Sequence, residues 1–176
     1  MDIYVARHGQ TDWNVENKVC GLTDADLTDK GIEQARRLSA EMKDKGIDII
    51  ITSPLKRAYL TGKIASEELN IPILTDKRLI EQNYGIYEGV DRKNTDFLNN
   101  KRYFAYKYPD GESMMQVAYR VYGFLDEIKQ THKGKTVLVV CHGGVCRVMH
   151  TYFHDMTNEE FFNYAPQNGE VKKYIL

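Results

Sequence analysis

The amino-acid sequence predicts a single α/β domain of three layers, with a mostly parallel sheet and helices on both of its faces. Its 176 residues are enough for one domain with a buried core. Short apolar runs alternate with segments of ten or more residues that have helical periodicity. The run "KTVLVV" at 135–140 does not alternate with polar residues, which is typical of a parallel strand covered on both faces.

The first half of the chain supplies two strands and two helices. A strand is expected at 3–6, because "IYVA" is wholly apolar and a polar loop follows it. Thr28 can cap the helix that comes next, in which apolar side chains recur at near-helical spacing. "IDIIIT" at 47–52 reads as a second buried strand. Ser53 is the expected N-cap of the following helix, with Pro54 at its first position, where a missing N–H costs nothing.

The second half contains an irregular segment and then the clearest strand. Residues 80–112 are aromatic, polar and without a regular period. Ser113 opens the next helix, because Gln116 three residues later completes a capping-box pattern. The remaining expected elements are strands at 71–74 and 171–176 and a helix over 145–154.

Composition and charge exclude several classes of partner. The formal net charge is -1, so no bulk basic field favours nucleic acid or an anionic membrane. No apolar run is long enough to span a bilayer, and the first residues do not resemble a secretory signal. Three cysteines without such a signal are typical of reduced thiols in the cytoplasm. The sequence carries no signature of an oligomeric state.

Two strands end in a histidine followed by glycine, Arg7-His8-Gly9 and His142-Gly143. In open α/β sheets, ligands bind outside the carboxyl ends of the strands, so these residues are expected to meet at one edge. A glycine there lets a backbone N–H approach a ligand closely, which makes Gly143 a candidate ligand contact. A guanidinium at the mouth of a buried strand needs an anion, and none is adjacent to Arg7 in the sequence.

Arg57 adds a second arginine at the same edge. It lies in the first turn of the helix after the second strand, where free N–H groups and the helix dipole attract anions. Taken alone, Arg57 reads as a solvated surface residue, and a lone histidine usually has a structural role. Two arginines and two histidines together suit a phosphoryl group, and imidazole is a competent nucleophile towards phosphorus.

Longer blocks of the sequence resemble a known family. "ARHGQTDWN" is similar to the Arg-His-Gly signature of the histidine phosphatase superfamily, in its phosphoglycerate mutase-like branch. Further blocks resemble that family in its own order: "GLTDADLTDKGIEQARRL", "TSPLKRAYLT", "LIEQNYGIYEG", "PDGES" and "VLVVCHGG". The resemblance covers nearly the whole chain and implies a phosphoglycerate mutase-like fold for residues 1–176.

The resemblance also implies a role for each site residue. His8 matches the nucleophile that becomes phosphohistidine. Glu81 matches the general acid that protonates the leaving oxygen and then acts as the base for water. From the sequence alone Glu81 is one glutamate among many, so only its family position singles it out. The contacts to the phosphoryl group are implied for Arg7, Asn14, Arg57 and His142.

A metal-independent phosphatase acting on small phosphorylated metabolites is the reaction we predict. Cofactor-dependent mutases of the family carry a longer insertion with paired arginines, whereas only 60 residues separate Glu81 from His142 here. "GIYEG" resembles the phosphatase form of its block, with Tyr87 at a position that often holds tryptophan. The alternatives are a 2,3-bisphosphoglycerate-dependent phosphoglycerate mutase and a catalytically silent module that binds a phosphorylated ligand. Neither a cofactor nor a metal is expected for the phosphatase.

Residues 82–112 are expected to form a lid that sets substrate specificity. The basic side chains Lys101, Arg102 and Lys107 are candidates to meet extra negative charge on the substrate. Six aromatic residues of the segment either line a pocket for an organic group or pack the lid itself: Tyr84, Tyr87, Tyr103, Phe104, Tyr106 and Tyr108. A zinc site is not expected, because Cys141, His142 and Cys146 match no common zinc spacing. The histidines at 132, 150 and 154 are read as structural or exposed.

Overall fold

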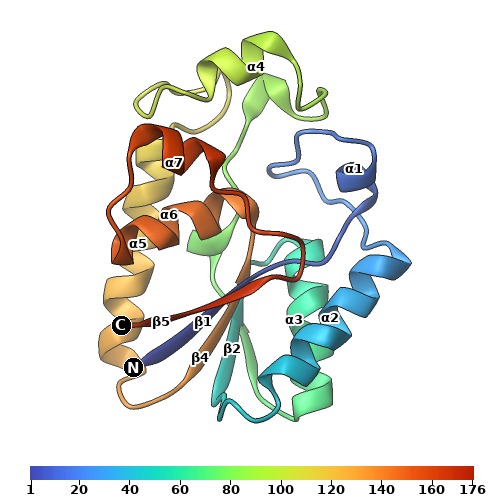
Figure 1. Cartoon of the computed structure of the whole chain (residues 1–176), viewed down its shortest axis with the longest axis vertical. Coiled ribbons are helices and arrows are strands. Elements are labelled where there is room, and N and C mark those ends of the chain that lie inside the picture. The colour runs from blue at the N-terminus through green and yellow to red at the C-terminus, as the bar shows by residue number, and fades with distance from the viewer.

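A five-stranded sheet organises the protein (Figure 1), whose computed structural model describes residues 1–176. The spatial order of the strands is β3-β2-β4-β1-β5. Neighbouring strands pair in parallel except β1 and β5, which are antiparallel, so the predicted mostly parallel sheet is confirmed. The strands are β1 Asp2–Arg7, β2 Ile49–Thr52, β3 Ile73–Thr75, β4 Val137–Cys141 and β5 Val171–Ile175.

Helices cover both faces of the sheet, which confirms the three layers. Figure 1 shows α2 and α3 against one face and α5 and α6 against the other. Each face has its own apolar core, the larger one under α5 and α6. No helix is both long enough and apolar enough to span a membrane. The helices are α1 Asp12–Val15, α2 Asp29–Met42, α3 Lys56–Leu69, α4 Thr95–Asn100, α5 Met114–Thr131, α6 Gly143–Phe153 and α7 Asn158–Asn163.

The register between β1 and β4 places the two histidines together. Arg7 is the partner of Cys141 in this parallel pair, so the next residue of each strand is a histidine. The His8 backbone N–H donates to the Cys141 carbonyl at 2.9 Å, which continues the ladder past the end of β1. The rings of His8 and His142 meet edge to face, with their centroids 5.2 Å apart. The two strand ends that the sequence predicts to meet therefore lie side by side at one edge of the sheet.

Two of the three predicted helix caps are confirmed and one is wrong. The Thr28 hydroxyl accepts from the backbone of α2, and Ser113 and Gln116 form the capping box of α5. Ser53 does not cap α3, which begins only at Lys56 after an uncapped turn. Its hydroxyl accepts from the Leu55 N–H at 3.3 Å and lies 2.7 Å from the imidazole of His142. Tertiary contact with the histidine thus replaces the expected cap.

Residues 82–112 form a small layer of their own beyond the carboxyl ends of the strands. The segment holds one 3₁₀ turn and α4, which lies at the top of Figure 1. Phe97 and Tyr108 are its buried centre, with Val19 from the loop between α1 and α2 packed against them. Because this cluster is separate from both cores of the sheet, the segment covers the sheet edge without being part of the main core.

The chain between 154 and 171 differs from the sequence expectation, which placed no element there. Thr157 and Glu160 form a capping box at the start of the short helix α7. Phe161 on this helix is buried in the larger core. The helix α6 also begins two residues earlier than expected, at Gly143, so its first N–H groups lie directly at the sheet edge.

Candidate active site

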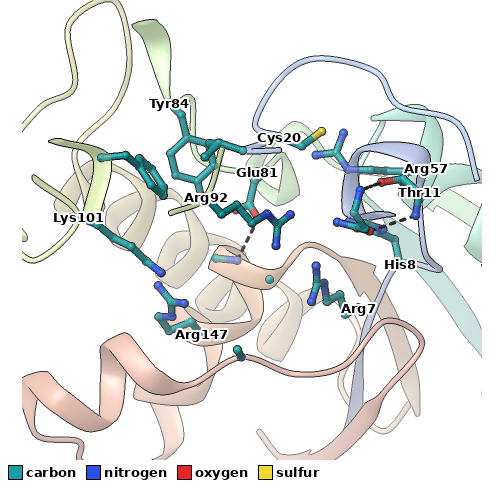
Figure 2. A pocket seen from close by; sticks show the side chains of 16 residues that line it. Arg7, His8, Thr11, Cys20, Arg57, Glu81, Tyr84, Arg92, Lys101 and Arg147 are labelled. Atoms are coloured by element: carbon teal, nitrogen blue, oxygen red, sulfur yellow. Dashed lines mark hydrogen bonds between the residues drawn. The ribbon is translucent and has the colours of Figure 1, made fainter. Parts of the chain in front are cut away.

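A cavity of about 160 Å³ opens at the carboxyl edge of the sheet (Figure 2). That is close to the ~150 Å³ cavity that can hold a benzene ring in another protein, so the space suits a small metabolite. Six of the seven predicted site residues line it: Arg7, His8, Asn14, Arg57, Glu81 and Gly143. The seventh, His142, is fully buried. Its ring packs against the ring of His8, which lines the cavity.

His8 is held as a neutral imidazole with one nitrogen free. Its Nδ1 lies 2.7 Å from the Gly9 carbonyl, and since a carbonyl only accepts, the proton sits on Nδ1. The lone pair is then on Nε2. Burial lowers the pKa of His8 well below its usual range, and the positive charges of Arg57 and Arg7 lower it further. The ring is therefore ready to act as a nucleophile at neutral pH.

His142 is oriented by the hydroxyl of Ser53, 2.7 Å from Nε2. The Ser53 hydroxyl already accepts from the Leu55 N–H, so its own proton is directed at Nε2 of His142. The proton of the neutral ring is then on Nδ1, which has no partner within the protein. Burial is the largest cause of its pKa lying well below the usual range, and Arg57 and His8 add to the shift. His142 is thus a neutral hydrogen-bond donor behind His8.

The two arginines of the site are held by backbone carbonyls rather than by carboxylates. Arg7 donates to the carbonyl of Pro166 at 2.8 Å. Arg57 donates to the carbonyls of Thr23 at 2.9 Å and Gly21 at 2.8 Å. A carbonyl fixes the orientation of a guanidinium but leaves its charge unneutralised. Both side chains therefore keep a full positive charge for a ligand.

Three buried side-chain nitrogens have no hydrogen-bond partner within the protein, and all three belong to this site: Arg7 Nε, Arg57 Nε and His142 Nδ1. No other buried side-chain nitrogen or oxygen of the chain is in this condition. Buried polar groups are nearly always paired, because an unpaired one costs about 1–3 kcal/mol. Three such donors around one imidazole match the oxygens of a phosphoryl group.

Glu81 is fixed by the N-terminus of α6. Its carboxylate accepts from the Gly144 N–H at 3.0 Å and from the Gln82 N–H at 2.9 Å. A Cβ at Gly144 would lie 2.5 Å from Glu81 Oε1, so only glycine leaves room for the carboxylate here. Arg120 holds the loop that carries Glu81 by donating to the carbonyl of Ile80 at 2.7 Å. No local pattern indicates the roles of Gly144 and Arg120, because both depend on contacts with residues far away along the chain.

Asn14 reaches the cavity from the short helix α1. Its Oδ1 accepts from the Thr11 N–H and from Asn168 Nδ2, each at 3.1 Å. The same Asn168 amide also donates to the His8 carbonyl at 3.0 Å. With its oxygen occupied in this way, Asn14 presents its amide N–H groups to a ligand, which suits the polar contact expected of it.

Glu88, in the "GIYEG" block, ties residues 82–112 to the loop that holds Arg57. Its carboxylate accepts from the N–H groups of Gly21 at 3.0 Å and Leu22 at 3.1 Å, and from the Thr23 hydroxyl at 3.0 Å. Gly21 and Thr23 are the residues whose carbonyls bind Arg57. Glu88 therefore positions the arginine through one intervening loop.

The extra positive charge at the cavity differs from the sequence expectation. Lys101 lines the cavity, but Arg102 and Lys107 do not; both are exposed, so the expectation was wrong for them. Arg92 and Arg147 line it instead. Neither could be found from local sequence, since Arg92 enters from the loop before α4 and Arg147 from the second turn of α6.

The six aromatic residues named for the 82–112 segment divide among packing, the cavity and the surface. Tyr84 lines the cavity, whereas Tyr87 and Tyr108 pack around Phe97 with ring centroids 5.4–6.1 Å apart. Two others, Tyr103 and Tyr106, are exposed, and Phe104 packs on the phenylalanines of α7. Of the two readings left open by the sequence, packing therefore describes three of the six residues and the cavity one, while the two exposed tyrosines fit neither.

Ligands for a metal ion are not gathered anywhere in the chain. No three His, Cys, Asp or Glu side chains are placed to hold one. Cys141 and Cys146 lie with their sulfurs 3.5 Å apart as buried free thiols, and His142 points to Ser53 rather than to them.

A family model described as "Histidine phosphatase superfamily (branch 1)" matches residues 3–175. The chain belongs to this superfamily. It is 38% identical over 149 residues to the "Uncharacterized phosphatase PhoE" of Bacillus subtilis, covering 85% of this chain and 75% of the relative. It is 31% identical to "Phosphoserine phosphatase 1" of Hydrogenobacter thermophilus, covering 96% and 83% of the two chains. It is also 33% identical to "Probable phosphoglycerate mutase GpmB" of Escherichia coli, covering 81% and 70%.

A solved structure supports the fold. The Bacillus stearothermophilus protein YhfR superimposes with a TM-score of 0.87 at 29% sequence identity, covering 98% of this chain and 89% of that one. The predicted family and the predicted fold are thus confirmed. The phosphatases named among the relatives are phosphoric monoester hydrolases, and this chain is an enzyme of the same superfamily.

Replacing Glu88 with Gln tests its positioning role. Because an amide offers one acceptor oxygen instead of two, the loop at Gly21–Thr23 loosens and Arg57 shifts. We expect the affinity for inorganic phosphate to fall by about tenfold, since a small misplacement of a binding group is expensive. Competitive inhibition by phosphate measures this. Glu41→Gln, an exposed change on α2, is the control. Unchanged phosphate affinity in Glu88→Gln contradicts the role.

Lys101 is predicted to destabilise the ligand-free protein at neutral pH. Burial, and after it the positive charges of Arg147 and Arg92, lower its pKa from 10.5 to about 8. Between these two pKa values the unfolded chain binds more protons than the folded one, so stability rises with pH across that window. We expect Lys101→Met to raise the melting temperature at pH 7 by a few degrees, with the difference narrowing as pH passes 8. The exposed Lys107→Met is the control. A lower melting temperature for Lys101→Met refutes this.

Proposed function

We propose that the protein is a metal-independent phosphatase that hydrolyses small phosphate monoesters through a phosphohistidine on His8. The observation that carries this proposal is the set of three unpaired donors around a neutral imidazole, on Arg7, Arg57 and His142. Such donors suit the oxygens of a phosphoryl group, and the free Nε2 of His8 suits attack on its phosphorus.

In the first step, His8 Nε2 attacks phosphorus and the bond from phosphorus to the ester oxygen breaks. The electrons of that bond go to the leaving oxygen, which takes a proton from Glu81. The guanidinium groups of Arg7 and Arg57 and the N–H of His142 stabilise the charge that spreads over the phosphoryl oxygens. The products are the free alcohol, phosphohistidine and the Glu81 carboxylate.

In the second step, the Glu81 carboxylate removes a proton from water. The oxygen of that water attacks phosphorus, and the bond from phosphorus to nitrogen breaks. Inorganic phosphate leaves, and both His8 and Glu81 return to their starting forms, so the cycle consumes one water and no cofactor. The same carboxyl group serves as acid and then as base, as the resemblance implies.

Hydrolysis is favoured over the two alternatives by particular features. A mutase must bind its product alcohol in a second orientation, and the short stretch between Glu81 and His142 carries no insertion for that purpose. GpmB among the relatives keeps the mutase as the alternative reaction. A silent binding module is disfavoured because a carboxylate beside a phosphate site weakens anion binding, whereas catalysis needs Glu81 there. The three free cysteines are in keeping with a reducing, cytoplasmic setting.

Replacing His8 with Ala is expected to abolish phosphate release from every ester while leaving the fold intact. His132→Ala, which changes a histidine at the end of α5, is the matched control. The assay contains a chelator throughout, and acid-labile, base-stable phosphate on the native protein after rapid quenching reports the intermediate. Persistent turnover in His8→Ala would falsify the nucleophile, and a strict metal requirement would overturn the metal-free mechanism.

Replacing Glu81 with Gln is expected to affect esters according to their leaving group. An alkyl phosphate needs a proton on its leaving oxygen, so kcat should fall by about 10²–10⁴-fold, the usual contribution of general acid catalysis. An aryl phosphate such as p-nitrophenyl phosphate needs little protonation, so formation of the phosphoenzyme should slow far less. Burst kinetics separate the two steps. An equal loss in the rate of phosphoenzyme formation for both esters argues against Glu81 as the acid.

A further inference from the structure

Three cations of the cavity have no role in the proposed reaction. Arg92, Lys101 and Arg147 line the same cavity as His8 but are not the arginines of the phosphate site. Figure 2 shows Lys101 and Arg147 pointing toward each other, with Arg92 between them and the cavity centre. Arg147 and Arg92 are the cations that most strongly affect the charge state of Lys101, so the three act on one region.

None of these three side chains forms an ion pair; every ion pair of the protein lies elsewhere. Arg92 donates from Nε to the Lys18 carbonyl at 2.9 Å, and Arg147 from Nε to the Tyr164 carbonyl at 3.0 Å. Arg147 also lies over the ring of Phe161 and is 7% exposed. Each guanidinium is therefore oriented by a neutral acceptor and keeps its terminal N–H groups for another partner.

Arginines outside the cavity show the contrast. Arg78 is bound by the carboxylates of Asp76 and Glu127, and Arg120 by that of Glu112. The protein thus pairs these two half-buried arginines with carboxylates where they serve structure. Arg92 and Arg147 are partly buried and have no carboxylate partner, which lowers the stability of the folded protein. The expected compensation is an anionic group of the ligand.

The charge balance indicates how much anion the cavity accepts. Five cations line it, and its one acidic side chain, Glu81, carries a proton when the proposed first step begins, so the surplus is five positive charges when Lys101 is protonated. The phosphoryl group of an ester brings about two negative charges at neutral pH. About three positive charges remain, which equals the number of cations outside the phosphate site. Tyr84 and Phe97 supply aromatic lining to the same cavity.

We propose that Arg92, Lys101 and Arg147 form a second anion subsite, which binds a carboxylate or a second phosphate carried by the substrate that loses its phosphoryl group at His8. The preferred substrates are then small phosphate esters with two anionic groups joined by a short linker. The cavity of about 160 Å³ leaves room for only a few carbon atoms between them. This inference rests on the proposed function for its catalytic readout.

Matched pairs of esters test the subsite. 3-Phosphoglycerate and glycerol 3-phosphate differ in one end group, a carboxylate or a neutral hydroxymethyl group. 1,3-Propanediol bisphosphate and its monophosphate test a second phosphate in the same way. We expect kcat/KM to be at least about tenfold higher for the doubly anionic member of at least one pair, the size of one charged hydrogen bond. The pair with the larger ratio identifies the anion.

Lys101→Met should reduce that ratio by about tenfold, because it removes one of the three charges. Arg147→Gln provides a second test, with its folding checked by thermal unfolding because the side chain also packs on Phe161. Arg102→Gln is the matched control, since Arg102 is the next residue, is exposed and does not line the cavity. The ratio should be the same in this control as in the native protein.

The outcomes separate the two proposals. Equal kcat/KM within both pairs, or a ratio that survives Lys101→Met and Arg147→Gln, overturns the subsite while hydrolysis itself supports the phosphatase. If no ester is hydrolysed, the proposed function fails, and calorimetric binding of the same four compounds tests the subsite. Tighter binding of the doubly anionic compounds then supports it, and equal binding overturns it.

Discussion

The structure depends on holding several cations at one edge of a sheet without neutralising them. Arg7, Arg57, Arg92 and Arg147 all donate to backbone carbonyls, and none meets a carboxylate. Burial and mutual repulsion make this arrangement unfavourable in the ligand-free protein. The two apolar cores, one on each face of the sheet, supply the stability that offsets the unfavourable electrostatics of these cations. The unpaired positive charges of the cavity attract an anionic ligand. Binding of a dianion removes part of the repulsion between these charges.

The same field sets the protonation of the histidines. Burial is the largest cause of the low pKa values of His8 and His142, and the neighbouring arginines strengthen it. A charged imidazole could not attack phosphorus, so in the proposed mechanism the cations that bind the phosphoryl group also keep His8 in the form that attacks. Since Nδ1 of His8 donates to the Gly9 carbonyl, the backbone selects which nitrogen reacts. Binding and nucleophilicity therefore have one electrostatic origin.

Features of the site that depend on local sequence could be predicted, and those that depend on distant partners could not. The strand ends at His8 and His142 were readable because parallel strands bring their carboxyl ends to one edge. Ser53 was misread because its position suits a cap, while its actual partner, His142, is 89 residues away. Arg147 and Glu88 gave no local signal for the same reason. Only the family resemblance could single out Glu81 among the glutamates.

Under the proposed function and the proposed second anion subsite, the 82–112 segment links substrate choice to phosphate binding. Lys101 and Arg92 belong to the segment and face the cavity, while Glu88 of the same segment holds the loop that orients Arg57. Its apolar cluster is separate from the cores of the sheet, so the segment can vary without disturbing them. His8, Glu81 and His142 are instead fixed by β1, β4 and the start of α6. A change of substrate can thus arise in the segment while the reacting groups stay in place, provided the Glu88 contacts are kept.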